Sequence, residues 1–322
     1  MIRAVCLNPV IDRTYYIDQF TAGRQYKNNE PSECVGGKGV NVAKVCAQLG
    51  EPAAVYGFVG GTAGERVRAE MARCCSSVCL LEVAGETRTT INVIDRSQNL
   101  ETEILEMGPS VVPAQAELLL CRLEEDLEKG DIVVCSGISI PGAPEDIYVR
   151  IGAMCEKAGA MCILDANGAT LRNAAEGRYY LCKPNQNELA ELCGEAPTTD
   201  AEALCRMARK VLPGRFEWIM VSMGAQGGLL VSGTECCLAE VPDVPVMSTI
   251  GSGDSCVAGF CVGLSRGMPP RQAFALGMAC GVANSMSDAV ACVSPDDVRR
   301  LLSRIMLSDP KQYSIETKGG PL

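Results

Sequence analysis

The sequence predicts an α/β protein with a mainly parallel sheet, helices on both faces and a small separate β-sheet. Three observations support this prediction. Short apolar runs typical of buried strands alternate with longer helical patterns along most of the chain. Glycine and polar clusters recur just after these runs, at the sheet edge where open α/β proteins bind ligands. Residues 13–35 and 87–106 instead alternate polar and apolar side chains, which predicts a lid built from two insertions.

Composition narrows the class of protein. The chain has 322 residues, of which 47% are hydrophobic and 4% aromatic, so we expect a large and mostly aliphatic core. The formal net charge of −10 disfavours nucleic-acid and membrane-surface partners. A phosphate ligand must therefore be held by local groups. No apolar run reaches the ~18 residues of a membrane span, and the N-terminal stretch lacks the features of a signal peptide, so we expect a cytoplasmic protein.

Cysteine and histidine usage restricts the chemistry. Most of the nineteen cysteines lie in apolar runs, and none forms a C-x-x-C pair. They are therefore expected to be free thiols that pack as small hydrophobic groups, and no structural zinc site is expected. The chain contains no histidine, which excludes every mechanism that needs an imidazole base. Carboxylates, lysines and backbone dipoles must do the chemistry.

The chain begins with a strand-like run that Pro9 ends, and this places Asp12 beyond the carboxyl end of the strand. An isolated aspartate there is as often a turn former as a ligand. Residues 36–41 (G-G-K-G-V-N) then open a helix that ends near residue 50. This is not a Walker A loop, because glycine follows Lys38. Three glycines in four residues nevertheless exceed what a helix cap requires.

The later elements follow from the same periodicities. Strands are predicted at 53–60, 78–83, 131–136, 161–165, 179–182, 217–222 and 229–232, and helices at 64–75, 113–129, 144–158, before 193, and at 200–212, 270–288 and 295–307.

The stretch Thr249–Asp254 (T-I-G-S-G-D) predicts a glycine turn followed by a buried helix. The N-terminus of a helix attracts anions, and glycines let a phosphate approach the backbone. Asp254 could accept the proton of an attacking hydroxyl, which points to phosphoryl transfer. Taken alone, such a motif is more often a cap made by Ser252 or Asp254.

With the two glycine motifs 36–41 and 249–254 in this order, the chain resembles the PfkB, or ribokinase-like, carbohydrate kinases over nearly its whole length. Residues 8–12 (N-P-V-I-D) and 87–89 (T-R-T) are similar to the branch of the family that acts on sugar phosphates. The resemblance implies a three-layer α/β/α domain with a β-sheet lid. The core would comprise residues 1–12, 36–86 and 107–322, and the lid residues 13–35 and 87–106.

The resemblance also implies roles at the acceptor side. Asp254 would be the catalytic base. The anion hole for the transferred group would be formed by the backbone of Gly251, Ser252 and Gly253. Sugar hydroxyls would be held by Asp12, Gly37 and Asn41, and the phosphate of the substrate would lie near Lys38 and Arg88. Arginine can grip a phosphate through two parallel hydrogen bonds, although a surface arginine is an equally common interpretation of Arg88 alone.

The nucleotide side is implied in the same way. The ATP site would be lined by Lys183, Ser222, Gly224, Gly227 and Asn284. Asn185 and Glu188 match the N-x-x-E pair that organises Mg²⁺ in the family, largely through water. Their spacing lets them face one side of a helix start, and Mg²⁺ takes few protein ligands. Without the resemblance, the same pair is more simply a capping box.

One stretch departs from the family pattern. The branch has G-S-x-P in the loop after a middle strand, with the serine near the substrate, whereas Ile138 follows Gly137 here and the serine comes one place later, at Ser139. Either Ser139 takes that place through a shifted loop or one substrate contact is missing. The departure bears on which sugar phosphate is bound.

We therefore expect an ATP- and Mg²⁺-dependent kinase that converts a ketohexose phosphate to a bisphosphate, with fructose 1-phosphate preferred and tagatose 6-phosphate or fructose 6-phosphate as alternatives. A homodimer through the lid is expected, because open sheet edges invite pairing. Another candidate is a catalytically silent sugar-binding regulator. A nicotinamide dehydrogenase is disfavoured, because no strand is followed by G-x-G-x-x-G with an acidic residue about 20 positions later.

Overall fold

The computed structural model describes residues 1–27, 31–98 and 100–309, so residues 28–30 and 99 of the expected lid and 310–322 of the expected core lie outside it. Within the described residues, ten strands form one sheet in which the seven from β11 to β5 are parallel and the remaining three antiparallel. In spatial order these are β14 (Met306–Ser308), β13 (Cys236–Glu240), β12 (Gly228–Val231), β11 (Phe216–Ser222), β10 (Tyr179–Cys182), β9 (Met161–Asp165), β8 (Ile132–Ser136), β1 (Ile2–Cys6), β4 (Ala53–Val59) and β5 (Ser77–Glu82).

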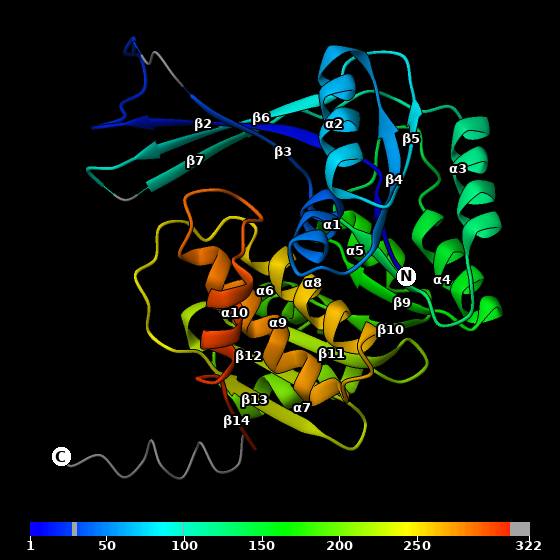
Figure 1. Cartoon of the computed structure of the whole chain (residues 1–322). Helices are drawn as coiled ribbons and strands as arrows, with labels where there is room; N and C mark the ends of the chain where they lie inside the picture. The colour runs from blue at the N-terminus through cyan, green and yellow to red at the C-terminus, as the bar shows by residue number, and fades with distance from the viewer. Residues whose placement is uncertain (28–30, 99, 310–322) are drawn as a thin grey trace.

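Helices cover both faces of this sheet (Figure 1), which makes the fold the expected ribokinase-like three-layer α/β/α arrangement. One face carries α1 (Lys38–Gln48), α2 (Gly61–Cys74), α8 (Ser252–Ser265), α9 (Pro270–Ser285) and α10 (Pro295–Leu302). The other carries α3 (Pro113–Asp126), α4 (Ile147–Ala158), α5 (Gly168–Ala174), α6 (Gln186–Cys193) and α7 (Ala201–Val211).

The strands separate two aliphatic cores, because successive side chains of a strand point to opposite faces. In β1, Ile2 and Ala4 join the core under α1 and α8, whereas Val5 joins the core under α3 and α4. All nineteen cysteines are free thiols, and many are fully buried in these cores, as predicted.

A second sheet has the order β3-β2-β6-β7, built from β2 (Val10–Ile17), β3 (Ser32–Gly36), β6 (Arg88–Asp95) and β7 (Leu100–Leu105). It projects from the body of the molecule beside α2 (Figure 1). Its strands come from the two stretches that the alternating pattern singled out. They extend slightly further, so that residues 10–12 and 36, grouped with the core from the sequence, lie in β2 and β3.

The C-terminal part differs from expectation. The helix predicted at 295–307 is wrong beyond Leu302, where α10 ends, because Met306–Ser308 form β14 and pair antiparallel with β13. Neither β13 nor the short helix α5 was predicted. No helix in the described part of the chain is both long and apolar enough to cross a membrane.

Candidate active site

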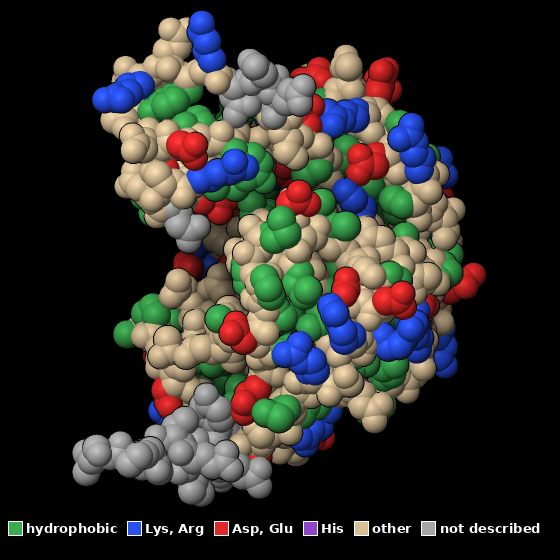
Figure 2. Space-filling model, turned by 60° about the vertical axis from the view of Figure 1, so that its left-hand side comes forward, with side chains coloured by type: hydrophobic (Ala, Val, Ile, Leu, Met, Phe, Trp, Pro, Cys, Tyr) green, Lys and Arg blue, Asp and Glu red, His purple; other side chains and the backbone are tan. Residues whose placement is uncertain are grey.

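The predicted site residues gather at the carboxyl edge of the large sheet, near the switch point where β1 lies between β4 and β8. Lys38 is the first residue of α1, and Asp254 lies in the first turn of α8. Asp165 ends β9, and Lys183 follows the end of β10. Figure 2 shows a hollow between the projecting small sheet and the body of the molecule.

Glycines shape the start of α8. Gly251 caps the helix in the left-handed region at φ 77°, and a Cβ there would come within 2.8 Å of a methyl carbon of Val290. A Cβ on Gly253 would lie 3.4 Å from Nζ of Lys183. The lysine therefore faces the first turn of α8, where helix geometry leaves amide groups unpaired and the dipole favours an anion.

Asp254 is held at this helix start as a buried carboxylate that is 7% exposed. Asn41 donates a hydrogen bond from Nδ2 to its Oδ2 at 2.7 Å. Burial raises the pKa of Asp254, while Lys38 and the bond from Asn41 act in the opposite direction. A carboxylate with a raised pKa is a better proton acceptor than one in water, so the geometry suits a general base.

Two lysines share one carboxylate oxygen. Nζ of Lys38 lies 2.9 Å from Oδ1 of Asp165, and Nζ of Lys183 lies 3.2 Å from the same atom. Burial opposes ionisation of Asp165, but the charges of Lys183 and Lys38 lower its pKa. The side chain of Lys38 is 28% exposed and that of Lys183 is 6% exposed, so Lys183 is the more deeply buried of the two.

Asp165 is the site residue that the sequence analysis missed. The recurrence of polar clusters after strands predicts a ligand-binding edge there but gives no role to Asp165. The pattern that could have found it is a strand of apolar residues, M-C-I-L, that ends in an aspartate. A buried charge must be paired with an opposite charge, and the carboxyl end of a parallel strand is where ligands bind.

Of the residues predicted to bind the acceptor, Asp12 and Arg88 lie on neighbouring strands of the small sheet, β2 and β6. Burial raises the pKa of Asp12 to about 6, with Arg88 acting against the rise. Gly36 leaves room for the Asp12 carboxylate, since a Cβ there would come 2.1 Å from Oδ2. Gly37 caps α1 at φ 104°, which lets the chain turn sharply into Lys38.

Arg88 is buried, and burial lowers its pKa. Its Nε donates to the carbonyl oxygen of Asn8 at 3.3 Å, and its Nη1 donates to that of Glu106 at 3.5 Å. A guanidinium has five N–H donors, so these two carbonyls leave donors for an anion.

Three residues at the site carry buried polar atoms without a hydrogen-bond partner among the described residues. They are Oδ1 of Asn41, Oγ of Ser139 and Oδ2 of Asp165. Buried polar atoms are normally paired, so these three are candidates for contact with a polar ligand. Ser139 is anchored through its backbone, because its N–H donates to Oγ1 of Thr170 at 3.1 Å and its hydroxyl stays available.

The predicted nucleotide residues Ser222, Gly224 and Gly227 form the turn from β11 to β12. The N–H of Ser222 donates to the carbonyl oxygen of Pro184 at 3.1 Å, which ties this turn to the end of β10 beside Lys183. Gly224 and Gly227 have φ values of 60° and 89°. Only glycine adopts both angles readily, so the turn stays narrow.

Asn185 and Glu188 form a capping box at the start of α6. Oδ1 of Asn185 accepts from the N–H of Glu188 at 2.9 Å, and Oε2 of Glu188 accepts from the N–H of Asn185 at 2.8 Å. The other carboxylate oxygen of Glu188 is not used by this box. Within the described residues, no three Asp, Glu, Cys or His side chains gather to hold a metal ion.

Asn284 occupies a different position from the other nucleotide-side residues. It is fully buried in α9, and its side-chain amide forms hydrogen bonds with the turn that opens α8 and with the loop after α9.

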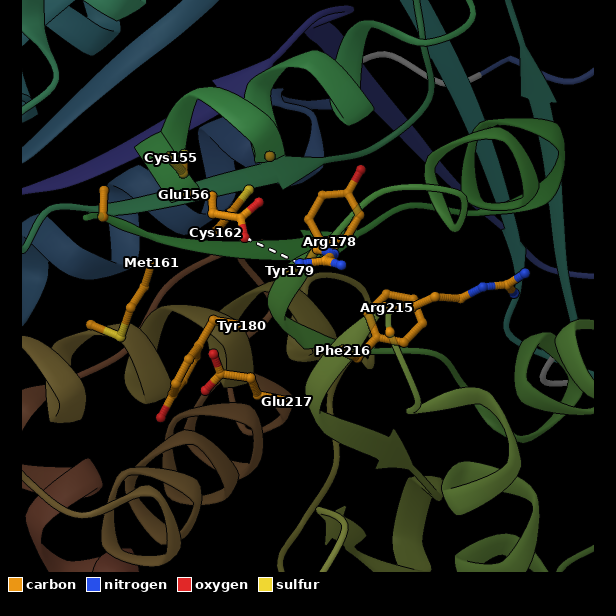
Figure 3. A pocket seen from close by; sticks show the side chains of 13 residues that line it. Cys155, Glu156, Met161, Cys162, Arg178, Tyr179, Tyr180, Arg215, Phe216 and Glu217 are labelled. Carbon is orange, nitrogen blue, oxygen red and sulfur yellow. Dashed lines mark hydrogen bonds and ion pairs between the residues drawn. The ribbon is translucent and has the colours of Figure 1, made fainter. Parts of the chain in front are cut away.

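A second hollow, a cavity of about 400 Å³, lies at the opposite edge of the sheet, where β9, β10 and β11 begin (Figure 3). Arg178 reaches toward Glu156 across it at 3.4 Å, and none of the predicted site residues lines it.

Comparison with known proteins identifies the family of the chain. The model of the pfkB family carbohydrate kinases matches residues 5–289. The 1-phosphofructokinase of Bacillus subtilis (strain 168) is 34% identical over 309 residues, which cover 96% of this chain and 99% of that protein.

Solved structures agree as well. Phosphofructokinase-2 from Escherichia coli, in complex with substrates and products, superposes with a TM-score of 0.85 at 28% identity and covers 94% of this chain and 98% of that one. Ribokinase of Arabidopsis thaliana, complexed with ribose and ATP, shares the fold with a TM-score of 0.75 at 20% identity over 94% of this chain and 98% of that one. The chain belongs to the pfkB family of carbohydrate kinases and is a phosphotransferase with an alcohol group as acceptor.

Proposed function

We propose that this protein transfers the γ-phosphoryl group of ATP to a ketohexose phosphate, with fructose 1-phosphate as the preferred acceptor and fructose 1,6-bisphosphate as the product. The proposal depends most on the placement of Asp254, buried at the N-terminus of α8 and bonded to Asn41, next to the Lys38–Asp165–Lys183 group. The base and the anion-binding amide groups then belong to the same helix start, beside the position proposed for the transferred group.

In the proposed reaction, Asp254 takes the proton of the acceptor hydroxyl. The hydroxyl oxygen forms a bond to the γ-phosphorus of ATP, and the bond from that phosphorus to the leaving oxygen breaks to give ADP. The first turn of α8 holds the charge of the group in transit through its amide groups. Lys183 lies beside that turn and would bind the phosphates of the nucleotide.

The acceptor would be held from the small sheet and from α1. Asp12 and Asn41 would accept and donate hydrogen bonds with sugar hydroxyls, and Lys38 with Arg88 would bind the phosphate that the substrate already carries. Lys38 and Arg88 together would favour a phosphorylated sugar over a neutral one. Local cations are needed to bind phosphate, because the net charge of −10 repels it. The B. subtilis relative bears the name of a 1-phosphofructokinase, which supports fructose 1-phosphate.

The residues present also fit Mg²⁺. The capping box leaves one Glu188 oxygen unused, and Asp165 has a buried Oδ2 without a partner among the described residues. Oxygen atoms of this kind suit a hard cation that keeps most of its waters. Bound Mg²⁺ would neutralise charge on the ATP phosphates, and Asn185 with Glu188 would hold it through water.

The small sheet would act as a lid that closes over the acceptor and excludes water, a competing acceptor. The same sheet would form a homodimer with a second copy. Its edge strand β7 exposes Leu100, Ile104 and Leu105 at 57%, 56% and 57%, more apolar surface than a free edge strand usually shows. Phosphofructokinase-2 from E. coli is known in a tetrameric inhibited form, so oligomers occur in a relative.

The test is ADP release with ATP, Mg²⁺ and a panel of fructose 1-phosphate, fructose 6-phosphate, tagatose 6-phosphate and fructose. We expect the highest kcat/KM with fructose 1-phosphate. Turnover of fructose alone would refute the sugar-phosphate assignment. Calorimetric binding of a sugar phosphate without any ADP release would refute the kinase and favour a silent sugar-binding protein.

A further inference from the structure

The orientation of the Asn284 side-chain amide is fixed by its partners. Its Nδ2 donates to the carbonyl oxygen of Ile250 at 2.8 Å, and its Oδ1 accepts from the N–H of Cys292 at 3.3 Å. A carbonyl oxygen can only accept and a backbone N–H can only donate, so a flipped amide would lose both bonds. The third contact, 3.1 Å to Oγ of Ser252, is therefore a bond in which Nδ2 donates and the hydroxyl oxygen accepts.

This arrangement determines what Ser252 can offer to an anion. Its backbone N–H already donates to the carbonyl oxygen of Thr249 at 3.2 Å. Its hydroxyl oxygen accepts from Asn284, so the one hydroxyl proton is free to point elsewhere. Ser252 is the first residue of α8, beside the glycines that leave the helix start open.

We propose that the Ser252 hydroxyl donates a hydrogen bond to the phosphoryl group in transfer, and that Asn284 is the positioning residue that keeps its proton directed there. Ser252 therefore serves the anion hole through its side chain, whereas the family resemblance implied its backbone. Asn284 acts through Ser252 and not by lining the ATP site. This inference rests on the proposed kinase function.

A chemical argument gives the expected size of the effect. A hydroxyl that donates to a charged oxygen forms a stronger bond than a neutral pair. Removing one donor from an anion hole commonly costs on the order of 10²-fold in kcat. Because the hydroxyl is proposed to contact the phosphoryl group while it is in transfer, and not to bind the ground-state substrates, kcat should fall more than the KM values change.

The loop after α9 offers a matched control. Gln48, at the end of α1, holds the same loop from the other side, since its Nε2 donates to the carbonyl oxygen of Ala291 at 2.9 Å and its Oε1 accepts from the N–H of Val293 at 2.7 Å. Gln48 and Asn284 thus both brace residues 291–293, but only Asn284 also contacts Ser252. Gln48→Ala removes the loop contact and leaves the serine untouched.

The experiment measures kcat and both KM values with the best acceptor of the panel for Ser252→Ala, Asn284→Ala, their double variant and Gln48→Ala. We expect kcat to fall about 10²-fold in Ser252→Ala. It should fall by a smaller factor in Asn284→Ala, where the hydroxyl remains but its proton is no longer directed. The double variant should be no slower than Ser252→Ala, because both changes act on the same bond. Gln48→Ala should keep kcat within about threefold, allowing for a slightly looser loop.

Asn284→Asp gives an independent measurement. A carboxylate cannot donate to Ile250 and would instead accept the Ser252 proton, which withdraws the hydroxyl from the phosphoryl group. We therefore expect a lower kcat than in Asn284→Ala, with thermal unfolding recorded for every variant to confirm that it is folded.

Several results would overturn the inference while leaving the kinase function intact. One is a double variant whose losses multiply, which would mean that the residues act separately. Others are a raised KM for ATP at unchanged kcat in Asn284→Ala, which would place the residue in the nucleotide site, and an equal loss in Gln48→Ala, which would mean that the loop brace alone matters. A wild type that turns over no acceptor would refute the proposed function itself.

Discussion

Nδ2 of Asn41 donates a 2.7 Å hydrogen bond to Oδ2 of Asp254, across 213 residues of sequence. The bond joins the first turn of α1 to the first turn of α8, so the two glycine motifs of the chain meet at one carboxylate. It fixes which oxygen of Asp254 is engaged, and in the proposed reaction the other oxygen would take the proton of the acceptor hydroxyl.

Replacing Asp254 by Asn tests the base directly. Asparagine keeps the size of the side chain but cannot take a proton, so kcat should fall about 10²- to 10⁴-fold. Binding of ATP, measured by calorimetry, should stay within a few-fold. Because burial raises the pKa of Asp254, wild-type kcat should decline on the acid side at a pH above the ordinary range of an aspartate. Unchanged turnover in the variant would remove Asp254 from the mechanism.

Asp12→Asn should raise the free energy of unfolding at pH 7 and weaken acceptor binding. The pKa of Asp12 is raised from 3.8 to about 6. A raised carboxyl pKa means that its stabilising contribution is complete below pH 3.8 and is lost as the pH rises through 6. The charged form thus costs up to about 3 kcal/mol at pH 7, which asparagine would relieve.

Urea unfolding at pH 7 should accordingly give a larger free energy of unfolding for Asp12→Asn than for wild type, and the difference should vanish near pH 4. The KM for the acceptor should rise about tenfold at pH 7, since a charged hydrogen bond to a sugar hydroxyl is lost. In wild type the same KM should rise as the pH falls below 6. A variant that is less stable at pH 7 would contradict the burial of the charge.

Replacing each of the two lysines that contact Asp165 should raise the KM of a different substrate. Lys38→Gln should raise the KM for the sugar phosphate about tenfold or more and leave the KM for ATP nearly unchanged. Lys183→Gln should do the opposite, because Nζ of Lys183 lies beside the first turn of α8. Steady-state kinetics with each substrate varied in turn checks this. Identical KM effects in both variants would mean that the pair serves one common site.

The proposed dimer can be tested on its exposed strand. Ile104 is 56% exposed on β7, and Ile104→Lys would place a charge in an apolar contact, so the dimer should dissociate in light scattering after gel filtration. Exposed Leu118, on α3, offers a control of similar apolar character away from the small sheet. Leu118→Lys should keep the dimer. A wild type that is monomeric at all concentrations would contradict the proposal.

The layers and the ligand-binding edge could be predicted from sequence because they follow from periodicity. Apolar runs that alternate with helical patterns determine a parallel sheet, and glycine clusters after strands mark its carboxyl edge. Short antiparallel additions are different: C-C-L-A-E at β13 and M-L-S at β14 are too brief to show a period. The periodicity of 295–307 therefore predicts one helix, although β14 occupies its end.

The hydrogen bonds of asparagine side chains could not be predicted from the sequence. The N-x-x-E spacing predicted both a capping box and a magnesium pair, and only the structure shows that Asn185 and Glu188 bond each other. The side chain of Asn284 gives no sign in the sequence that it faces Ser252, because the two residues meet through the crossing of α8 and α9. Asp165 was overlooked for the same reason, since its importance depends on lysines from two distant elements.

The single oxygen of Asp165 that Lys38 and Lys183 share has a consequence for how such a protein can diversify. When either lysine is replaced, Asp165 keeps the other as an ion-pair partner, so its buried charge is not left unpaired. With the proposed roles, a lineage could therefore change its acceptor pocket at position 38 while its nucleotide pocket is kept. The carboxylate makes the two halves of the site separately evolvable.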